Sequence, residues 1–370
     1  MGQKLLSICI PTWNRASVLE KTLNNIVSQA LEFKDKVEIC ISNNGSTDNT
    51  KEVVMKFKEK YPDLVKYNEN EKNLGFDKNL LKVLEISQGH FAWTFSDDDS
   101  IVNNGLKEVI NFLEHIKDKN VGVVLLNVQG SYFDEEKNVV GLTTGFIDEN
   151  TLGDFEMGAE DAVNRLDTGF MSPLIFNNKL LKKMNQESYE LVEKGLGLFY
   201  MHTWLYFLIF VLNESRKRYL LKKPVVIGGW SESERYYIKP AVEREFLFVY
   251  YVCTMFDMLQ SITTNTNFIS SFNKLKRHAK IDFIYTRLAL YKAFNKFNYI
   301  SYFGCIRLFF SCLKFIDAVL FSLSFMIISI TPSFILRGLC KTAKKIKYGK
   351  RAEDLWKRTI AGWHKTGKER

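Results

Sequence analysis

The chain has 370 residues, which is enough for a full hydrophobic core and, we expect, two domains. Hydrophobic residues at 46% and charged residues at 25% are ordinary for a globular protein. The net charge of +9 is concentrated at one end, because the segment 341–370 holds eleven Lys and Arg against three Asp and Glu. Since these basic residues lie in a tail without a recognised nucleic-acid-binding motif, we expect no nucleic-acid partner.

The six cysteines are scattered, with no paired spacing and no CxxC motif, and no signal-peptide pattern opens the sequence. They are Cys9, Cys40, Cys253, Cys305, Cys312 and Cys340. We therefore expect buried thiols in a reducing compartment and no metal site built from Cys and His.

Strand and helix patterns alternate through the first 130 residues. The expected elements, in chain order, are a strand at 5–10, a helix at 16–30, a strand at 37–41, a helix at 47–60, a short strand at 65–67, a helix at 77–87, a strand at 91–95, a helix at 104–117 and a strand at 121–128. This order predicts an α/β fold with a doubly wound, mostly parallel sheet. From about Asp148 the alternation stops, and the remainder is expected to be mainly helical, most clearly at 246–262 and 281–297.

Three carboxylates in a row, Asp97, Asp98 and Asp99, follow the apolar strand at 91–95 with only Ser96 between. In α/β sheets, ligands bind beyond this end of the strands. Because three like charges are costly unless they share a cation, a hard divalent metal that holds a phosphorylated substrate is the economical candidate. The alternative is a solvated acidic turn that caps the next helix.

Further polar segments are expected at the same crevice. They are Pro11-Thr12-Trp13-Asn14-Arg15 after the first strand, Ser42-Asn43-Asn44-Gly45-Ser46-Thr47-Asp48 after the second, and Asn73-Leu74-Gly75-Phe76-Asp77-Lys78-Asn79 at the entry to the third helix. Singly, the first and third are compatible with plain turn chemistry. Four ordered motifs with matching spacing, however, are a specific signal.

The combined pattern resembles the family 2 glycosyltransferases of bacterial surface-glycan type, which have the nucleotide-sugar-binding A-type fold, over roughly residues 4–130. The resemblance implies a metal-dependent, inverting transfer of a sugar from a nucleoside diphosphate sugar to a hydroxyl of a lipid-linked or cell-surface glycan, with Mn²⁺ or Mg²⁺ as cofactor. Asp98 matches the family's principal metal-binding aspartate. Asp97 and Asp99 would contact the donor or share the metal, Asp99 being the second ligand. The other implied nucleotide-sugar contacts are Pro11, Thr12, Asn14, Arg15, Asn73, Gly75 and Asn79.

Asn43 and Asn44 stand where the family commonly has an acidic pair, whose second carboxylate accepts a hydrogen bond from uracil. An amide can accept from uracil, but it can also donate to N3 of cytosine, which an ionised carboxylate cannot do. We therefore expect both residues in the nucleotide site, and both a UDP-linked and a CDP-linked donor stay open.

The family resemblance also implies a general base on a helix in the second half of the chain. His202, in the uncharged stretch 195–213, is the candidate base, and a hydrogen-bonded core histidine is the alternative. Asp161, Asp167 and Glu193 are the other possible bases. The loop 228–235 lacks the histidine of many relatives, yet it would act as a lid with Arg235 on a phosphate, or else be a plain surface loop.

We expect a catalytic domain over 1–235, whose parts 1–130 and 131–235 bind donor and acceptor, then a helical region at 236–298 and a membrane-associating segment with a basic tail at 299–370. The uncharged stretch 318–336 is a poor transmembrane helix because it holds four serines, Thr331 and Pro332. Before it, 299–316 has the aromatic, charge-interrupted pattern of an interfacial amphipathic helix. We expect peripheral or monotopic attachment to an anionic membrane at the cytoplasmic face, with a true span second.

Two other functions remain open. A nucleotidyltransferase uses a similar sheet and acidic metal site, but it would need a glycine-rich loop after the first strand, and 11–15 has no glycine. A non-catalytic scaffold that binds sugar nucleotides would explain Asn43 and Asn44, whereas the intact acidic triplet argues against it.

Overall fold

The computed structural model describes residues 3–133, 139–142, 156–163, 171–197, 201–228, 241–281 and 330–348, together with 319, 322–323 and 326–328. The chain divides into two compact units. The first is Met1–Glu232 with Asp257–Phe272, and the second is Ser233–Phe256 with Asn273–Arg370. All described residues of the candidate site belong to the first unit.

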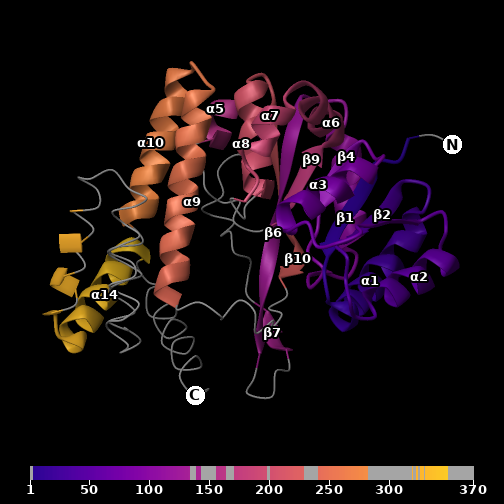
Figure 1. The fold of residues 1–370 in the computed structure, drawn as a ribbon, viewed down its shortest axis with the longest axis horizontal. Helices are drawn as coiled ribbons and strands as arrows, with labels where there is room; N and C mark the ends of the chain where they lie inside the picture. The colour runs from indigo at the N-terminus through magenta and orange to yellow at the C-terminus, as the bar shows by residue number, and fades with distance from the viewer. Residues whose placement is uncertain are drawn as a thin grey trace. The chain divides into compact units, whose positions relative to one another are not determined.

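Four parallel strands form the N-terminal half of the sheet in the order β3-β2-β1-β4 (Figure 1). They are β1 (Leu6–Thr12), β2 (Val37–Asn43), β3 (Val65–Glu69) and β4 (Phe91–Thr94). Every residue of β1, β2 and β4 is buried, as expected for strands that are covered on both faces. The order confirms the predicted doubly wound topology, in which the loops after β1, β2 and β4 meet at one edge of the sheet.

The helices of this half are α1 (Ala16–Ala30), α2 (Thr50–Lys60), α3 (Phe76–Ile86) and α4 (Gly105–Ile116), with the short 3₁₀ helix η1 (Leu31–Phe33) after α1. In α1, Leu19, Leu23 and Ile26 recur at helical spacing and are fully buried. Helices α1 and α2 lie side by side, whereas α3 packs against β1 and β2 (Figure 1). All four helices predicted for residues 1–130 are present, and their ends differ from the prediction by at most a few residues.

The second half of the sheet contains more strands than the single one, at 121–128, that the sequence analysis predicted there. It continues from β4 through β9 (Leu174–Asn177), β6 (Val121–Phe133), β10 (Lys217–Gly228) and β5 (Ser100–Ile101), with β7 (Val139–Leu142) paired to β6 and β8 (Glu156–Met157) paired to β10. Strand β9 is antiparallel to both β4 and β6, so the sheet is mixed although mostly parallel. A four-residue apolar run such as β9 cannot be told from a piece of buried helix by its periodicity.

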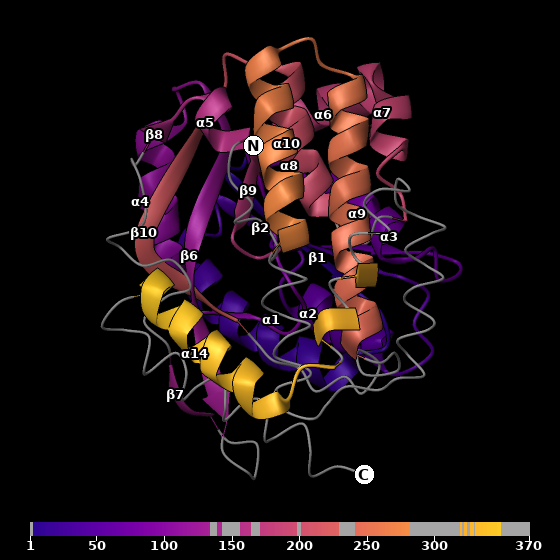
Figure 2. The same ribbon diagram turned by 90° about the vertical axis from the view of Figure 1, so that its left-hand side faces the viewer.

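The remaining described chain is mainly helical, as expected. In the first unit it contains α5 (Ala159–Val163), α6 (Asn178–Glu187), α7 (Tyr189–Glu193) and α8 (Met201–Leu212), while α9 (Ala241–Ser261) and α10 (Thr266–Ile281) have residues in both units. The second unit holds α14 (Ser333–Tyr348), drawn in yellow in Figure 2. Of the predicted helix at 281–297 only Ile281 lies in the described part. No helix among the described residues is both long and apolar enough to cross a membrane.

The cysteines agree with the prediction where the structure describes them. Cys9, Cys40, Cys253 and Cys340 are buried and are not joined in disulfides. Cys305 and Cys312 lie outside the described residues.

Candidate active site

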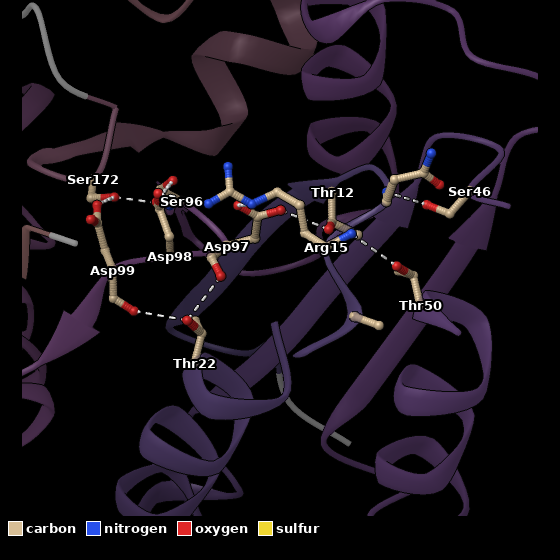
Figure 3. A network of polar contacts seen from close by, with 12 residues as sticks. Thr12, Arg15, Thr22, Ser46, Thr50, Ser96, Asp97, Asp98, Asp99 and Ser172 are labelled. Carbon is tan, nitrogen blue, oxygen red and sulfur yellow. Dashed lines mark hydrogen bonds and ion pairs between the residues drawn. The ribbon is translucent and has the colours of Figure 1, made fainter. Parts of the chain in front are cut away.

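Arg15 supplies the cation that the acidic triplet requires. Its Nε lies 3.2 Å from Oδ1 of Asp97, and its terminal Nη2 lies 2.8 Å from Oδ2 of Asp98. Figure 3 shows the guanidinium reaching across Asp97 towards Asp98. The Arg15 side chain is one-quarter exposed, so a phosphate can compete for its guanidinium. The sequence placed Arg15 near the phosphates but did not predict that it pairs with these carboxylates.

Asp97 is the buried member of the triplet. Burial raises the pKa of its carboxyl to about 6, although the Arg15 guanidinium acts in the opposite direction, and neighbouring Asp98 raises it further. The Thr12 hydroxyl donates a hydrogen bond of 2.7 Å to its Oδ2. Since Arg15 and Thr12 already occupy this carboxylate, its main task is to fix the loop between β1 and α1 against the end of β4.

Asp98 and Asp99 point to different partners. Asp98 accepts a hydrogen bond from the Ser96 hydroxyl, whereas Asp99 accepts one from the Ser172 hydroxyl, which lies just before β9. The backbone of the turn is held from α1, because the Thr22 hydroxyl donates to the carbonyls of Asp97 and Asp99 over 2.9 and 3.1 Å (Figure 3). Strand β5 separates the triplet from α4, whose N-cap is Asn104, so the alternative of a helix cap is wrong.

A metal fits this arrangement only with help from a ligand. Among the described residues, no group of three or more His, Cys, Asp and Glu side chains is placed to hold an ion. Yet Asp98 is 15% exposed and carries hard carboxylate oxygens, and Mg²⁺ in phosphate sites is commonly held by one or two carboxylates together with substrate phosphates. Asp98 therefore fits an ion that it shares with a diphosphate, whereas the Asp99 carboxylate is held on Ser172, and the described residues do not form a complete cage.

The loop after β2 is hydrogen-bonded to the loop after β1. Asn14 has a left-handed backbone, with φ of 52°, and its N–H donates 2.9 Å to the Ser46 hydroxyl. Its side-chain oxygen in turn accepts 2.7 Å from the Thr47 N–H. The N–H of Ala16, the first residue of α1, donates 3.1 Å to Asp48. Asn14 thus has a structural task inside the predicted site, and Pro11 lies within β1 opposite Ser42.

A network of side-chain amides joins the ends of β1, β2 and β3 to the loop before α3. Asn79 accepts from the Ser42 hydroxyl at 2.7 Å and from Asn70 at 2.9 Å, and it donates 3.0 Å to the Ser42 carbonyl. Asn43 donates 3.0 Å to the Tyr67 hydroxyl. The network bonds to the carbonyl of Thr12, whose hydroxyl bonds to Asp97, so this residue connects the amide network to the acidic triplet.

Asn44 lies at the centre of the amide network. Its Nδ2 donates 2.9 Å to Oδ1 of Asn73 and 3.2 Å to the Gly75 carbonyl. Its Oδ1 accepts from Nδ2 of Asn70 at 3.0 Å and from the Leu74 N–H at 2.9 Å. The structure therefore brings the predicted residues Asn44, Asn73, Gly75 and Asn79 together through hydrogen bonds among them, and the Asn43 carbonyl joins them by accepting from the Asn70 N–H.

The proposed bases lie in different environments. His202 is only 4% exposed on α8, and Met201–Val211 is buried along its whole length, which favours the alternative of a core histidine. Asp161 on α5 and Glu193 on α7 are exposed. Asp167 and Arg235 lie outside the described residues, as does the loop beyond Gly228. Sequence reasoning missed Thr22 and Ser172, because neither stands in a motif and both reach the triplet only through the fold.

The chain is similar in sequence to known glycosyltransferases. The family model described as "Glycosyl transferase family 2" matches residues 7–168. Abequosyltransferase RfbV of Salmonella typhimurium is 38% identical over 110 residues, which cover 30% of this chain and 33% of that protein. The GalNAc(5)-diNAcBac-PP-undecaprenol beta-1,3-glucosyltransferase of Campylobacter jejuni is 30% identical over 189 residues, or 50% of this chain and 56% of that protein. The matched part thus spans only a third to about half of these relatives.

The fold has a solved counterpart. The mannosyltransferase PcManGT from Pyrobaculum calidifontis, in complex with GDP-Man and Mn2+, superposes with a TM-score of 0.54 at 15% identity, over 97% of this chain and 85% of that one. At this level of identity the likeness concerns the fold alone.

Proposed function

The chain belongs to glycosyltransferase family 2, and from that premise we propose that it transfers a sugar from a nucleoside diphosphate sugar to a hydroxyl group of a glycan. The observation that carries the proposal is the cluster at the end of β4, where the Asp98 carboxylate lies 2.8 Å from the Arg15 guanidinium and Asp99 is the next residue along the chain. Carboxylates for a divalent ion and a guanidinium for phosphate are the groups that a leaving diphosphate requires.

Each side chain of this cluster has a distinct task in the proposed reaction. Asp98, supported by Asp99, would hold Mn²⁺ or Mg²⁺, which when bound neutralises charge on the leaving diphosphate. Arg15 would turn from Asp98 to the diphosphate when the donor binds, since both partners are anions in reach of one guanidinium. Asp97 stays in place and keeps the β1 loop closed against β4 through Thr12.

The acceptor must lose a proton to a general base as the new bond forms, and we propose transfer with inversion. The candidates to test are exposed Asp161 and Glu193 and, although its burial favours a core role, His202. We propose a lipid-linked or cell-surface glycan as acceptor, and the name of one relative, GalNAc(5)-diNAcBac-PP-undecaprenol beta-1,3-glucosyltransferase, supports the lipid-linked form. We propose a UDP-linked or a CDP-linked sugar as donor.

The second unit supports a reaction at a membrane surface. On α14, Leu336 and Cys340 are buried, four residues apart, while Phe334 and Leu339 are 74% and 60% exposed. Exposed basic residues, Arg337 and Lys341, lie on the same helix. Further exposed apolar residues precede it, namely Leu323, Met326, Ile327 and Ile330. Apolar side chains beside Lys and Arg suit a helix that lies on an anionic bilayer, so we propose peripheral attachment at the cytoplasmic face.

A thermal-shift screen of UDP, CDP, GDP and dTDP, with and without Mn²⁺, tests the proposed reaction class. We expect one nucleotide to raise the melting temperature only when Mn²⁺ is present, and Asp98→Asn to abolish that rise while the variant stays folded. Stabilisation by no nucleotide would contradict the proposal and favour a scaffold. The anomeric configuration of the product, read by NMR, tests inversion.

A vesicle sedimentation assay tests the membrane proposal. Phe334→Ser with Leu339→Ser should lower the bound fraction on anionic vesicles about tenfold or more, because two large apolar side chains no longer insert. The matched control is Leu31→Ser, which removes an exposed leucine from the first unit and should bind like the unmodified protein. Unchanged binding of the double variant would contradict the proposal.

A further inference from the structure

The side chain of Asn44 has no hydrogen-bonding capacity left for a ligand. A side-chain amide offers two N–H donors and one oxygen with two lone pairs. Both donors are used, on Asn73 and on the Gly75 carbonyl, and both lone pairs are used, by Asn70 and by the Leu74 N–H. The residue is 3% exposed. A nucleotide base could bond to it only after one of these four bonds had broken.

Three of the four partners belong to one short loop, Asn73–Gly75, and the loop itself is accessible. Asn73 and Gly75 are exposed, in contrast to Asn44 beneath them. A second contact holds the same loop at its start, because a Cβ on Gly45 would lie 2.7 Å from the carbonyl carbon of Lys72. The absence of a side chain at Gly45 thus allows the two backbones to touch. Amide and glycine together fix the loop on the end of β2.

We propose that Asn44 is a positioning residue, which acts on the donor only through the Asn73–Gly75 loop and does not read the nucleotide base. The inference rests on the proposed function, because it concerns the nucleotide side of that site. It also explains why position 44 holds an amide and not a carboxylate. A carboxylate at this position has no donor, and it would place negative charge against the Gly75 carbonyl and Oδ1 of Asn73. The Asn identity therefore follows from the loop, and it carries no information about uracil or cytosine.

The substitution Asn44→Asp tests this inference because it keeps the shape, removes the two donors and places a negative charge against their former acceptors. We expect hydrogen exchange of the ligand-free protein to become at least about tenfold faster in peptides that cover 72–76, since the loop loses two of its anchors. We expect the affinity for every nucleoside diphosphate to fall by a similar factor, about tenfold, with the order of preference among UDP, CDP, GDP and dTDP unchanged.

Asn25→Asp is the matched control. Asn25 on α1 donates 3.0 Å to the Ile101 carbonyl and accepts 2.7 Å from the Ile101 N–H, so the same change removes one donor bond far from the loop in sequence. We expect it to lower the melting temperature while exchange at 72–76 and nucleotide affinity stay as in the unmodified protein. Asn73→Ala, which removes one partner of Asn44 from the exposed side, is the second variant if Asn44→Asp does not fold. It should give the same faster exchange.

Two results would overturn the inference. One is a rate of hydrogen exchange at 72–76 that is unchanged in both Asn44→Asp and Asn73→Ala. The other is a change of preference between UDP and CDP by more than about tenfold in Asn44→Asp, which would make the residue a reader of the base. The exchange measurement needs no nucleotide, so it decides the positioning role even if the unmodified protein binds none and the proposed function fails.

Discussion

The two sides of the candidate site are held together by different chemistry. At the end of β4 the contacts are between charges, because the guanidinium of Arg15, whose side chain is 24% exposed, spans two carboxylates. At the ends of β2 and β3 they are between neutral amides, with Asn44 and Asn79 buried and their groups paired. A charged pair near solvent exchanges partners at little cost, whereas a satisfied buried network is costly to disturb. We therefore expect the contacts of Arg15 with Asp97 and Asp98 to rearrange around a diphosphate and a metal, and the amide network around Asn44 and Asn79 to keep its structure.

Asp98→Asn should have the largest effect on activity and a small one on stability. The variant keeps the shape but loses the charge that pairs with Arg15 and that would bind the metal. We expect the turnover rate to fall by about two to three orders of magnitude, the usual loss when a group that stabilises developing charge is removed. Initial-rate kinetics with saturating Mn²⁺ measure it.

The control for this variant is Asp63→Asn, which neutralises an exposed carboxylate after α2. It should leave the rate within about twofold. If Asp98→Asn had a turnover rate close to that of the control, the proposed role of Asp98 in catalysis would be wrong.

Asn79→Ala should have the opposite profile, with the main effect on stability. The substitution leaves the Ser42 hydroxyl, the Ser42 carbonyl and the Asn70 amide without their buried partner. We expect the free energy of unfolding to fall by about 3 kcal/mol, measured by urea denaturation. Lys78→Ala, one residue earlier and exposed, is the control and should change it by less than about 0.5 kcal/mol. Equal values for the two variants would mean that the amide network contributes nothing to rigidity.

A pair of glycine substitutions separates backbone strain from loop contact on the amide side. Gly45 and Gly75 both have positive φ, 65° and 84°, so alanine is strained at either position. Only at Gly45 would the new Cβ also meet the Lys72 backbone, at 2.7 Å, whereas nothing lies within 4 Å at Gly75. We expect Gly45→Ala to cost about 1–2 kcal/mol more than Gly75→Ala in urea denaturation. Equal costs would mean that the close approach of the two loops is unimportant.

The smallest expected effect concerns Asp48, at the start of α2. Partial burial raises the pKa of its carboxyl, but hydrogen bonds from the Thr50 hydroxyl and from the Ala16 and Thr50 N–H groups outweigh this, and the net shift is downward. An acid with a lowered folded-state pKa stabilises the fold above its ordinary value of 3.8 and loses that contribution as the pH falls below it. Asp48→Asn should therefore lower the melting temperature by about 1–3 °C at pH 7, and by less at pH 3.5. A difference that is the same at both pH values would contradict this.

The sequence predicted the doubly wound half of the fold well, because apolar periodicity and short polar loops are local properties. It also predicted that the loops bearing Thr12, Asn44 and Asp98 meet, since strand order fixes this. It did not predict the contacts between residues that lie far apart along the chain. Ser172 reaches Asp99 because β9 inserts between β4 and β6, and no local pattern announces that insertion. The saturation of Asn44 was equally hidden, because counting its bonds requires the positions of Asn70, Asn73 and Gly75.

The most direct test of the mechanism is the affinity of the protein for Mn²⁺, measured by electron paramagnetic resonance with and without the nucleoside diphosphate selected in the thermal-shift screen, after subtraction of the Mn²⁺ that the same nucleotide binds without protein. Because the described residues form no complete metal cage and Asp98 needs the diphosphate as a co-ligand, we expect weak binding of Mn²⁺ alone. We expect affinity at least about tenfold higher with the nucleotide, and no gain in Asp98→Asn. Mn²⁺ that binds equally well without a nucleotide, or a gain that survives in Asp98→Asn, would contradict it.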